Sequence, residues 1–516
     1  MLFRSQLIDG LNRNSSPGID GITAEHLLYG KSDVLCTYLA KFLSHILSHT
    51  VVPKIYSYGI IIPVLKKPTL NPNRPENYRP ITLSSTFAKL TELLLLPNDD
   101  VHPNQYGFRE GRSTSMAASF LQDIISFSKH QGSPLHVASL DAEKCFDRIW
   151  HVGLMYKLLD KLPPAEWKFL YVWYSNLYGI VRINGNYSQP FPITRGTRQG
   201  SVLSPAIFNI FLDGLLKQLS TMDAGISIDR KVYNSFAYAD DITLFSTSVP
   251  GLQKLIDTCN SYADVWGFNF NVAKSKCMIY GKHRFCKIPD WYLGTQKLTC
   301  VDRFKILDTI YRDDYSADDH VETRVNNTRR AYYSLAGAGM KYPGLSSEVK
   351  SYLWNSICKP TLLFGMDSLC IHKKHVSRLD SFQAELLKQC LGISKRSHHS
   401  KLLSAMGIRP VHHDLKQRIC SLYHRIFATD SPGRDLTLYF LSQYMSNGKL
   451  YCGTLIEKIV SMNMSPITAA FSQHKPHSIT EQDGVVDSLR FLIHHENFIK
   501  PYSEEHLLVS LLTRAF

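Results

Sequence analysis

Two adjacent carboxylates, Asp240 and Asp241, lie between short apolar segments in the run FAYADDITLF, residues 236–245. Apolar, β-prone residues on both sides of an acidic pair predict a tight hairpin with the acids at its tip. Adjacent carboxylates repel each other, and a divalent cation with a second ligand elsewhere would relieve that repulsion. The pattern therefore indicates phosphoryl or nucleotidyl transfer, with a plain polar-tipped hairpin as the alternative.

A third carboxylate, Asp141, follows the short apolar segment HVASL, residues 136–140. Helical spacing then runs from Phe146 to Trp150, so Asp141 is predicted to lie where a strand gives way to a helix. Catalytic groups of α/β proteins gather at such strand ends. Asp141 and Asp240 could together hold two metal ions roughly 3.5–4 Å apart, one lowering the pKa of an attacking hydroxyl and one holding triphosphate oxygens.

A glycine-containing loop, RGTRQGSVLS at residues 195–204, precedes an amphipathic helix that has Pro205 in its first turn. Glycine lets the backbone approach a ligand closely, and a loop before a helix N-terminus favours anions. Gln199 and Gly200 are therefore placed to line a nucleotide pocket. Judged alone, the segment fits an ordinary helix start better.

Taken in order, segments of this chain resemble the fingers and palm of reverse transcriptases, most closely those of non-LTR (LINE-type) retrotransposons. The resemblance spans about 270 residues, and so many ordered segments do not agree by chance. The segments are SPGIDGITAEHL, IIPVLKKP, ENYRPITLSSTFAKLTE, QYGFREGRST, SLDAEKCFDRIW (motif A), GTRQGSVLSPAIFNIFLDGL (motif B), FAYADD (motif C) and WGFNFNVAKSKCMIYG (motif D).

The resemblance assigns the metal site. Asp141, Asp240 and Asp241 match the catalytic aspartates, with Asp141 and Asp240 as the main ligands and Asp241 beside them. The backbone carbonyl of Ala142 would help to hold one metal. The ion it implies is Mg²⁺, with Mn²⁺ as the alternative. Asp147 is expected to cap or pair locally rather than to bind metal.

The resemblance also assigns nucleotide contacts. Phe146 matches the steric gate that excludes a ribose 2′-hydroxyl, the group that distinguishes ribose from deoxyribose, although pattern alone favours core packing. Gln199, with Gly200 beside it, matches the motif B glutamine that contacts the incoming nucleotide and template.

Three cationic roles follow from the same resemblance. Arg79 matches the fingers arginine that grips the triphosphate, and Lys66, ahead of Lys67, is its expected partner. Lys274 matches the motif D lysine that would protonate the pyrophosphate leaving group. Judged from the sequence pattern alone, Arg79 and Lys66 would be interpreted as solvated surface charges.

The composition favours a folded protein with a polyanionic partner. The 516 residues are 44% hydrophobic and 20% charged, and the net charge is +14. Residues 320–425 carry 17 Lys and Arg against 6 Asp and Glu, a net charge of +11, where a thumb would contact phosphates. We expect no secretory leader and no membrane span, and scattered reduced cysteines in an intracellular protein of the nucleus or cytoplasm.

The predicted fold is α+β, a right-hand polymerase with an antiparallel sheet in fingers and palm, a helical thumb and a mostly helical C-terminal extension. We place the fingers at 1–135, the palm at 136–285, a basic helical thumb and connection at 286–430, and an extension of unknown role at 431–516. Helices are predicted in residues 321–337, in 347–360, ended by Pro360, and in 375–393.

The chain departs from the family in three places. The connection TELLLLPNDDVHPNQYGF between fingers segments is short. Asp308 follows Leu307 where the family usually has Leu-Gly at the primer grip, and aspartate resists backbone conformations that glycine permits. We expect no endonuclease segment before the fingers and no RNase H-like acids or zinc knuckle after them, and therefore a truncated copy or a partial gene model.

The sequence therefore predicts an RNA-directed DNA polymerase that uses an RNA template, a DNA primer or target and deoxynucleotides. The alternative is a decayed polymerase fold that only binds nucleic acid. A viral RNA polymerase is a lesser rival, because its hairpin usually reads Gly-Asp-Asp and it lacks the gate at Phe146. A group II intron maturase should carry a further RNA-binding domain. The sequence indicates no oligomeric state.

Overall fold

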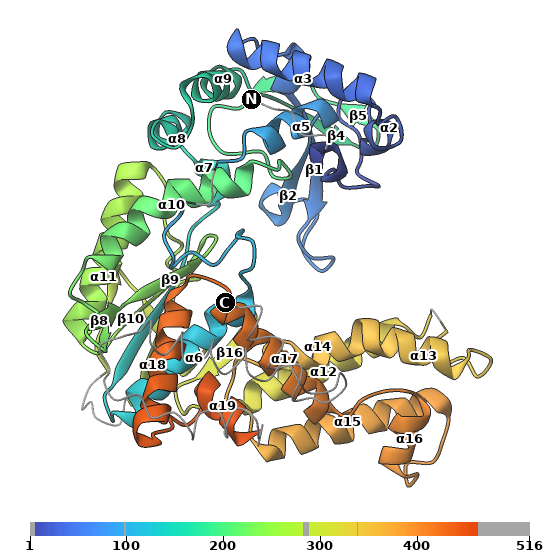
Figure 1. The fold of residues 1–516 in the computed structure, drawn as a ribbon, viewed down its shortest axis with the longest axis vertical. Helices are drawn as coiled ribbons and strands as arrows, with labels where there is room; N and C mark the ends of the chain where they lie inside the picture. The colour runs from blue at the N-terminus through green and yellow to red at the C-terminus, as the bar shows by residue number, and fades with distance from the viewer. Residues whose placement is uncertain (1–5, 98–99, 282–287, 338, 463–516) are drawn as a thin grey trace, which may run out of the picture. The chain divides into compact units, whose positions relative to one another are not determined.

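The computed structural model describes residues 6–97, 100–281, 288–337 and 339–462 (Figure 1). The end of the predicted palm, residues 282–285, and residues 463–516 of the predicted extension lie outside the described residues. The chain forms two compact units, each built from separate stretches of sequence. One comprises residues 1–108, 141–219 and 257–271, and the other 109–140, 220–256 and 272–516.

The first unit is built on a sheet with strand order β2-β1-β4-β5, in which β6 also pairs with β4. β1 pairs antiparallel with β2 and parallel with β4, so the sheet is mixed. Its strands are β1 (Tyr58–Leu65), β2 (Tyr78–Leu83), β4 (Tyr178–Ile183), β5 (Asn186–Tyr187) and β6 (Phe191–Pro192). Its helices are α1 (Gln6–Asp9), α2 (Ala24–Tyr29), α3 (Asp33–Ser48), α4 (Lys54–Ser57), η1 (Pro75–Asn77), α5 (Thr86–Leu94), α7 (Cys145–Arg148), α8 (His151–Leu158), α9 (Pro164–Ser175) and α10 (Ser204–Ser220).

The second unit contains a sheet with strand order β14-β11-β3-β10-β9. β3 is buried along most of its length, and the Phe120 ring of the covering helix α6 contacts Phe236 and Phe245 at centroid distances of 6.0 Å. The elements are α6 (Thr114–His130), β3 (Leu135–Asp141), β9 (Ser235–Tyr238), β10 (Asp241–Ser246), β11 (Lys276–Tyr280) and β14 (Thr299–Cys300). Two-stranded ladders are β7 (Ile226–Ile228) with β8 (Lys231–Tyr233), β12 (Tyr292–Leu293) with β13 (Gln296–Lys297), and β15 (Arg303–Ile306) with β16 (Thr309–Arg312). Helix α11 (Val249–Trp266) runs from this unit into the first.

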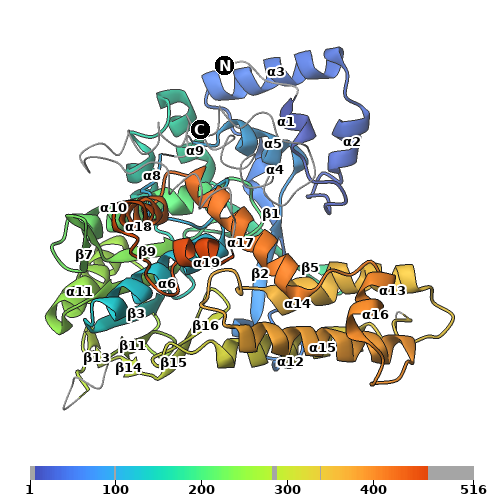
Figure 2. The same ribbon diagram turned by 60° about the horizontal axis from the view of Figure 1, so that its bottom comes forward.

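The rest of the second unit is helical. Figure 2 shows α12 and α15 side by side, and Arg378 of α15 donates to Glu322 of α12 at 2.8 Å. The helices are α12 (Asp318–Ser334), α13 (Ser347–Leu353), η3 (Trp354–Cys358), α14 (Lys359–Leu363), α15 (Lys373–Leu391), α16 (His399–Ala405), α17 (Val411–Phe427), α18 (Pro432–Asn447) and α19 (Leu455–Ser461). The three helices predicted in 321–393 are confirmed.

One predicted helix end is wrong, because Pro360 does not stop the second of these helices. A π-helical turn, η3, precedes it, and Pro360 occupies the first turn of α14, which continues to Leu363. Proline is tolerated in a first turn because no intrahelical N–H bond is needed there.

The predicted α+β class is confirmed by two sheets surrounded by helices. The prediction of an antiparallel sheet is corrected, because both sheets are mixed: β1 pairs parallel with β4, and β11 pairs parallel with β14. The predicted borders at residues 135, 285 and 430 stay predictions. In the part of the chain that the structure describes, no helix is long and apolar enough to cross a bilayer, and the cysteines are free thiols.

Candidate active site

The acidic hairpin forms as predicted. Tyr238 of β9 pairs with Asp241 of β10, so the connecting loop contains two residues, Ala239 and Asp240. Ala239 has a φ of 55°, a left-handed conformation typical of such tight turns but costly for a residue with a Cβ. Both aspartates are half-buried. Strained backbone conformations concentrate at functional sites. In this turn Asp240 is the second loop residue, and Asp241 is the first residue of β10.

Asp141 is the last residue of β3, and α7 begins four residues later, which confirms the predicted strand-to-helix position. The backbone there is held by a second segment of the first unit. Asn271 donates its N–H to the Asp141 carbonyl at 2.8 Å, and Ala142 forms an antiparallel bridge with Phe270. β3 and β10 are hydrogen-bonded neighbours in the sheet, so the strands that carry Asp141 and Asp241 are adjacent.

The metal site itself stays a prediction. Within the described ranges, no group of three or more His, Cys, Asp and Glu side chains is arranged to hold a metal ion. Asp141 belongs to the first compact unit, whereas Asp240 and Asp241 belong to the second. The chemistry of the donors still fits the proposed ion, because carboxylate and carbonyl oxygens are the ligands that Mg²⁺ prefers.

The loop with Gln199 and Gly200 packs against β2. Thr82 donates its N–H to the Gln199 carbonyl at 2.7 Å. Gly200 has a φ of 109°, and a Cβ there would lie 2.9 Å from the Thr82 carbonyl oxygen. The Gln199 side chain donates to Asp147 Oδ1 at 2.8 Å, so the local pairing predicted for Asp147 is confirmed. Glycine is thus required at 200 by both its conformation and the closeness of β2.

Sequence reasoning missed a buried charged network beneath this loop. The Arg198 guanidinium donates to the carbonyls of Tyr56 and Ser57, and Val202 donates its N–H to Glu92 Oε2 at 2.8 Å. Burial raises the pKa of Glu92 and lowers that of Arg198. The only sequence signal was a glutamate, Glu92, within the leucine-rich run TELLLL. The network ties the loop to α4 and α5.

Phe146 is held by two other aromatic rings. Its ring stacks on Phe208 of α10 with a centroid distance of 4.2 Å, and Phe108 meets it edge-on at 5.8 Å. Thr197 donates its N–H to the Phe146 carbonyl at 2.8 Å. The two roles considered for Phe146, core packing and a steric gate, are compatible. Its ring is half-buried and held by two neighbouring rings, so its remaining surface is rigid.

Lys66 and Arg79 lie on one antiparallel hairpin. Val64 pairs with Arg79, and Lys66 donates its backbone N–H to Asn77, so Lys66 and Arg79 are diagonal neighbours. The Lys66 ammonium donates to the Glu76 carbonyl at 2.7 Å. The Arg79 side chain is exposed and makes no hydrogen bond or ion pair to any residue that the structure describes. Lys274 is exposed in the turn before β11, in the second unit.

Asp308 has a left-handed backbone conformation, which glycine adopts without strain. Leu307 and Asp308 form the two-residue loop between β15 and β16, with φ values of 49° and 65°. Arg324 donates to the Asp308 carbonyl and lies 3.3 Å from its carboxylate, and Lys305 pairs with the same carboxylate. The Lys305 hydrogen bond is the main cause that lowers the Asp308 pKa. The departure is therefore accommodated, because aspartate tolerates the left-handed region when its side chain is held.

Residues 64–312 match the family model described as reverse transcriptase (RNA-dependent DNA polymerase). Over this segment the chain is similar to reverse transcriptases. The segment contains every residue predicted for the site, from Lys66 to Lys274. The predicted resemblance to reverse transcriptases of non-LTR retrotransposons is confirmed by the relatives described next.

The chain is 28% identical over 284 residues to the "Probable RNA-directed DNA polymerase from transposon BS" of Drosophila melanogaster, covering 52% of this chain and 31% of that protein. It is 26% identical over 303 residues to the Pol polyprotein of the fly element R2DM, covering 56% and 28%. The polymerase of the fly element jockey is 24% identical over 378 residues, covering 70% and 40%. The chain thus spans about a third of the length of these relatives.

Among solved structures, the chain is similar to apo telomerase from Candida tropicalis. One structure shares 12% identity at a TM-score of 0.36, covering 79% of this chain and 74% of that chain. A form truncated from its C-terminal domain shares 14% identity at a TM-score of 0.34, covering 54% and 60%.

Proposed function

We propose that this chain is an RNA-directed DNA polymerase of a retrotransposon. It joins the 3′-hydroxyl oxygen of a primer to the α-phosphorus of a deoxynucleotide, and the bond to pyrophosphate breaks. The observation that carries the proposal is the strained acidic hairpin of Ala239 to Asp241 inside the segment that is similar to reverse transcriptases, on the strand next to the one that ends at Asp141.

Asp141 and Asp240 would hold the divalent metal, Mg²⁺ or alternatively Mn²⁺, with Asp241 beside them and the Ala142 carbonyl as a further oxygen ligand. When bound, such ions lower the pKa of the attacking hydroxyl and neutralise charge on the transferring phosphate. The half-buried position of the three aspartates supports this assignment, because carboxylates partly removed from water attract a cation more strongly.

The remaining site residues would bind and orient the nucleotide. Arg79, exposed on its hairpin, grips the triphosphate with Lys66. Phe146 bars a 2′-hydroxyl, with its ring held against Phe208. Gln199, released from Asp147 when the site fills, contacts the nucleotide and template.

Two further assignments belong to the proposal. Lys274 gives its proton to the leaving pyrophosphate oxygen, and its exposed position allows it to reach a ligand. Gly200 lets the loop approach the nucleotide closely.

The proposed partners are an RNA template, a DNA primer or target strand, and deoxynucleotides, inside the cell in the nucleus or cytoplasm. The net charge of +14 supports polyanionic partners. The fingers, palm, thumb and extension would follow the borders at 135, 285 and 430.

Primer extension by the purified chain tests the function. An RNA template, a DNA primer and Mg²⁺ would be used, with deoxynucleotides compared with ribonucleotides. We expect extension with deoxynucleotides only, and none from the Asp240→Asn, Asp241→Asn double variant. If the chain binds template–primer in a salt-dependent way but never extends it, the alternative of a decayed fold replaces the proposal. The ion pairs of Asp308 with Lys305 and Arg324 support the polymerase over the decayed fold, because they hold and neutralise its carboxylate.

A further inference from the structure

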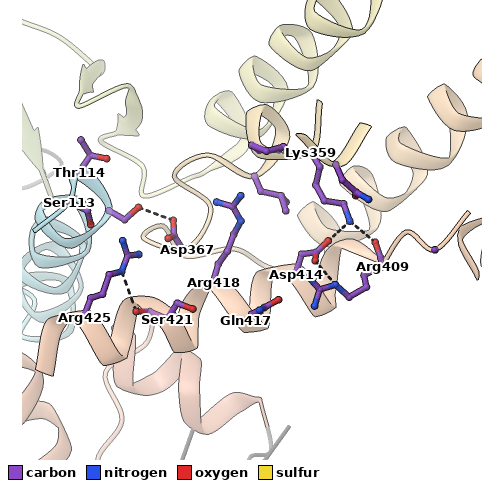
Figure 3. Close-up of a pocket in the computed structure, with 15 residues that line it drawn as sticks. Ser113, Thr114, Lys359, Asp367, Arg409, Asp414, Gln417, Arg418, Ser421 and Arg425 are labelled. Atoms are coloured by element: carbon purple, nitrogen blue, oxygen red, sulfur yellow. Dashed lines mark hydrogen bonds and ion pairs between the residues drawn. The ribbon is translucent and has the colours of Figure 1, made fainter. Parts of the chain in front are cut away.

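The second unit contains a cavity of about 740 Å³ between the N-terminus of α6, the helix α14 and the helix α17 (Figure 3). Its Lys and Arg side chains belong to the basic stretch at 320–425, which the sequence already predicts to contact phosphates. Two of them, Lys359 and Arg409, lie 2.6 Å and 3.2 Å from the buried Asp414 carboxylate. The cavity therefore belongs to the surface already expected to contact phosphates.

A separate contact in the first unit joins the segment that carries Phe146 to the loop before α10. We call residues 146–151 the gate segment. Thr197 donates its N–H to the Phe146 carbonyl at 2.8 Å, and Gly196 donates its N–H to the Ile149 carbonyl at 2.8 Å. Two backbone hydrogen bonds therefore hold this loop against the gate segment.

Gly196 approaches the gate segment too closely to carry a side chain. Its φ is 83°, in the left-handed region that favours glycine. A Cβ at this position would lie 2.7 Å from the carbonyl oxygen of Asp147 and 2.8 Å from its Cα. Such contacts are shorter than van der Waals packing allows, so one of the two backbones would have to move. Because Asp147 follows Phe146 directly, a movement of the gate segment would displace Phe146 as well.

His151, the last residue of the gate segment, binds the same glycine through its side chain. Its Nε2 lies 2.7 Å from the Gly196 carbonyl oxygen, and a carbonyl only accepts, so Nε2 donates. The imidazole is half-buried and meets the Tyr174 ring edge-on at a centroid distance of 5.2 Å. Both backbone polar groups of Gly196 are therefore bonded to the gate segment, the N–H to Ile149 and the carbonyl to His151.

The ring of Phe146 is held by the same stretch of chain as its backbone. The loop binds the Phe146 carbonyl, and Phe208 of α10, the helix that follows the loop, stacks on the ring at a centroid distance of 4.2 Å. A shift of the gate segment against the loop would therefore change where the ring lies. A gate that acts by steric contact depends on that position, because a misplacement of about 1 Å can change an enzyme's rate strongly.

We propose that Gly196 and His151 are positioning residues for sugar discrimination, which hold the Phe146 backbone where its ring excludes a ribose 2′-hydroxyl. The proposal rests on the proposed function, in which Phe146 is the steric gate. Both residues act through the gate segment rather than by contact with the nucleotide. A purely structural role would change stability and total activity, but it would leave the preference for deoxyribose over ribose intact.

Primer extension with paired deoxy- and ribonucleotides tests the proposal. The measured quantity is the ratio of kcat/KM for a deoxynucleotide to kcat/KM for the matching ribonucleotide. Gly196→Ala should lower this ratio by about tenfold or more, because a displaced ring leaves room for the 2′-hydroxyl. Gly185→Ala is the matched control, since Gly185 has the same φ of 83° but no atom within 4 Å of an added Cβ. It should leave the ratio unchanged.

Variants of His151 provide an independent test. His151→Leu removes the donor to the Gly196 carbonyl and should lower the same ratio. His151→Gln keeps an N–H donor and should restore most of the preference for deoxynucleotides. This pair keeps the proposal testable if Gly196→Ala does not fold, and thermal unfolding identifies the variants that are folded.

The position of the gate can also be measured without catalysis. 4-Fluorophenylalanine placed at position 146 gives a single fluorine NMR resonance, whose shift reports the surroundings of that ring. Gly196→Ala and His151→Leu should shift the resonance, and Gly185→Ala should not. An absence of extension by the wild type counts against the polymerase function, whereas the resonance still tests whether the two residues hold the gate.

Two results would overturn the proposal. One is an unchanged sugar preference in folded Gly196→Ala and His151→Leu variants of a chain that extends primers. The other is an unchanged resonance at position 146 in both variants, whether or not the chain extends primers.

Discussion

Position 200 requires glycine because of its backbone conformation and its close approach to β2. Its φ of 109° and the 2.9 Å approach of a Cβ to Thr82 O both exclude a side chain. Gly200→Ala should displace the loop and lower primer extension at least tenfold. Gly185→Ala is the control, because Gly185 has a φ of 83° with open space around it. That variant should lose roughly 1 kcal/mol of stability but keep its activity. Equal activity losses in both would contradict the role of the close contact.

Leu307 occupies the first loop position of the β15–β16 hairpin with a φ of 49°. A leucine there costs about 1–2 kcal/mol, whereas asparagine is favoured in such turns. Leu307→Asn should therefore raise the free energy of unfolding by about 1 kcal/mol. Urea unfolding measures the change, and Leu307→Ala, which keeps the Cβ and its conformational cost, should show no gain. A gain with alanine would assign the effect to side-chain exposure.

At the scale of elements, Arg198 connects the loop at 197–203 with the segment around α4. Arg198→Met would leave the carbonyls of Tyr56 and Ser57 without donors and Glu92 without a nearby cation. Breaking a buried charged network typically costs 3–5 kcal/mol, and we expect a loss of about that size in urea unfolding.

Arg195→Met is the control for this prediction. Arg195 lies three residues earlier in the same loop and is exposed, so its replacement should change stability by less than about 0.5 kcal/mol. Similar losses for both variants would show that the loop, and not the buried guanidinium, determines stability.

The elements that could be predicted are those whose sequence pattern lies within a few consecutive residues. The hairpin at Asp240 and the strand end at Asp141 follow from alternating apolar and acidic residues within ten positions. The partners of Arg198 lie more than 140 residues away, so no local pattern could identify them. Pro360 was misread for a related reason, since the π-helical turn before it depends on packing rather than on propensity.

For the whole molecule, the interleaved units are the feature that sequence could not predict. The chain enters each compact unit three times, whereas the predicted domains were consecutive stretches. Contacts inside the second unit span most of its length. Asp123 of α6 accepts the N–H of Leu455, the first residue of α19, at 2.9 Å. A carboxylate at a helix N-terminus stabilises that helix, so Asp123 ties the last described helix to one far earlier in the chain.

The same contact predicts a pH dependence of stability. Burial raises the pKa of Asp123 from 3.8 to about 7, against the opposing charge of Lys458. Because the folded state binds the proton more tightly, this group's contribution is present at low pH and is lost as pH rises from about 4 to 7. His136 and His320 act in the opposite direction, since burial lowers the pKa of each to about 4.

The difference between the wild type and Asp123→Asn isolates the aspartate, because the asparagine amide oxygen can still accept the Leu455 N–H. Relative to the variant, the wild type should lose about 1.4 kcal/mol of unfolding free energy per pH unit, roughly 4 kcal/mol between pH 4 and 7. Urea unfolding at unit steps of pH measures this. Asp223→Asn, at an exposed position of the same unit, should follow the wild type throughout. Parallel curves for wild type and Asp123→Asn would mean that Asp123 is ionised in the folded state across this range, with Lys458 neutralising it fully.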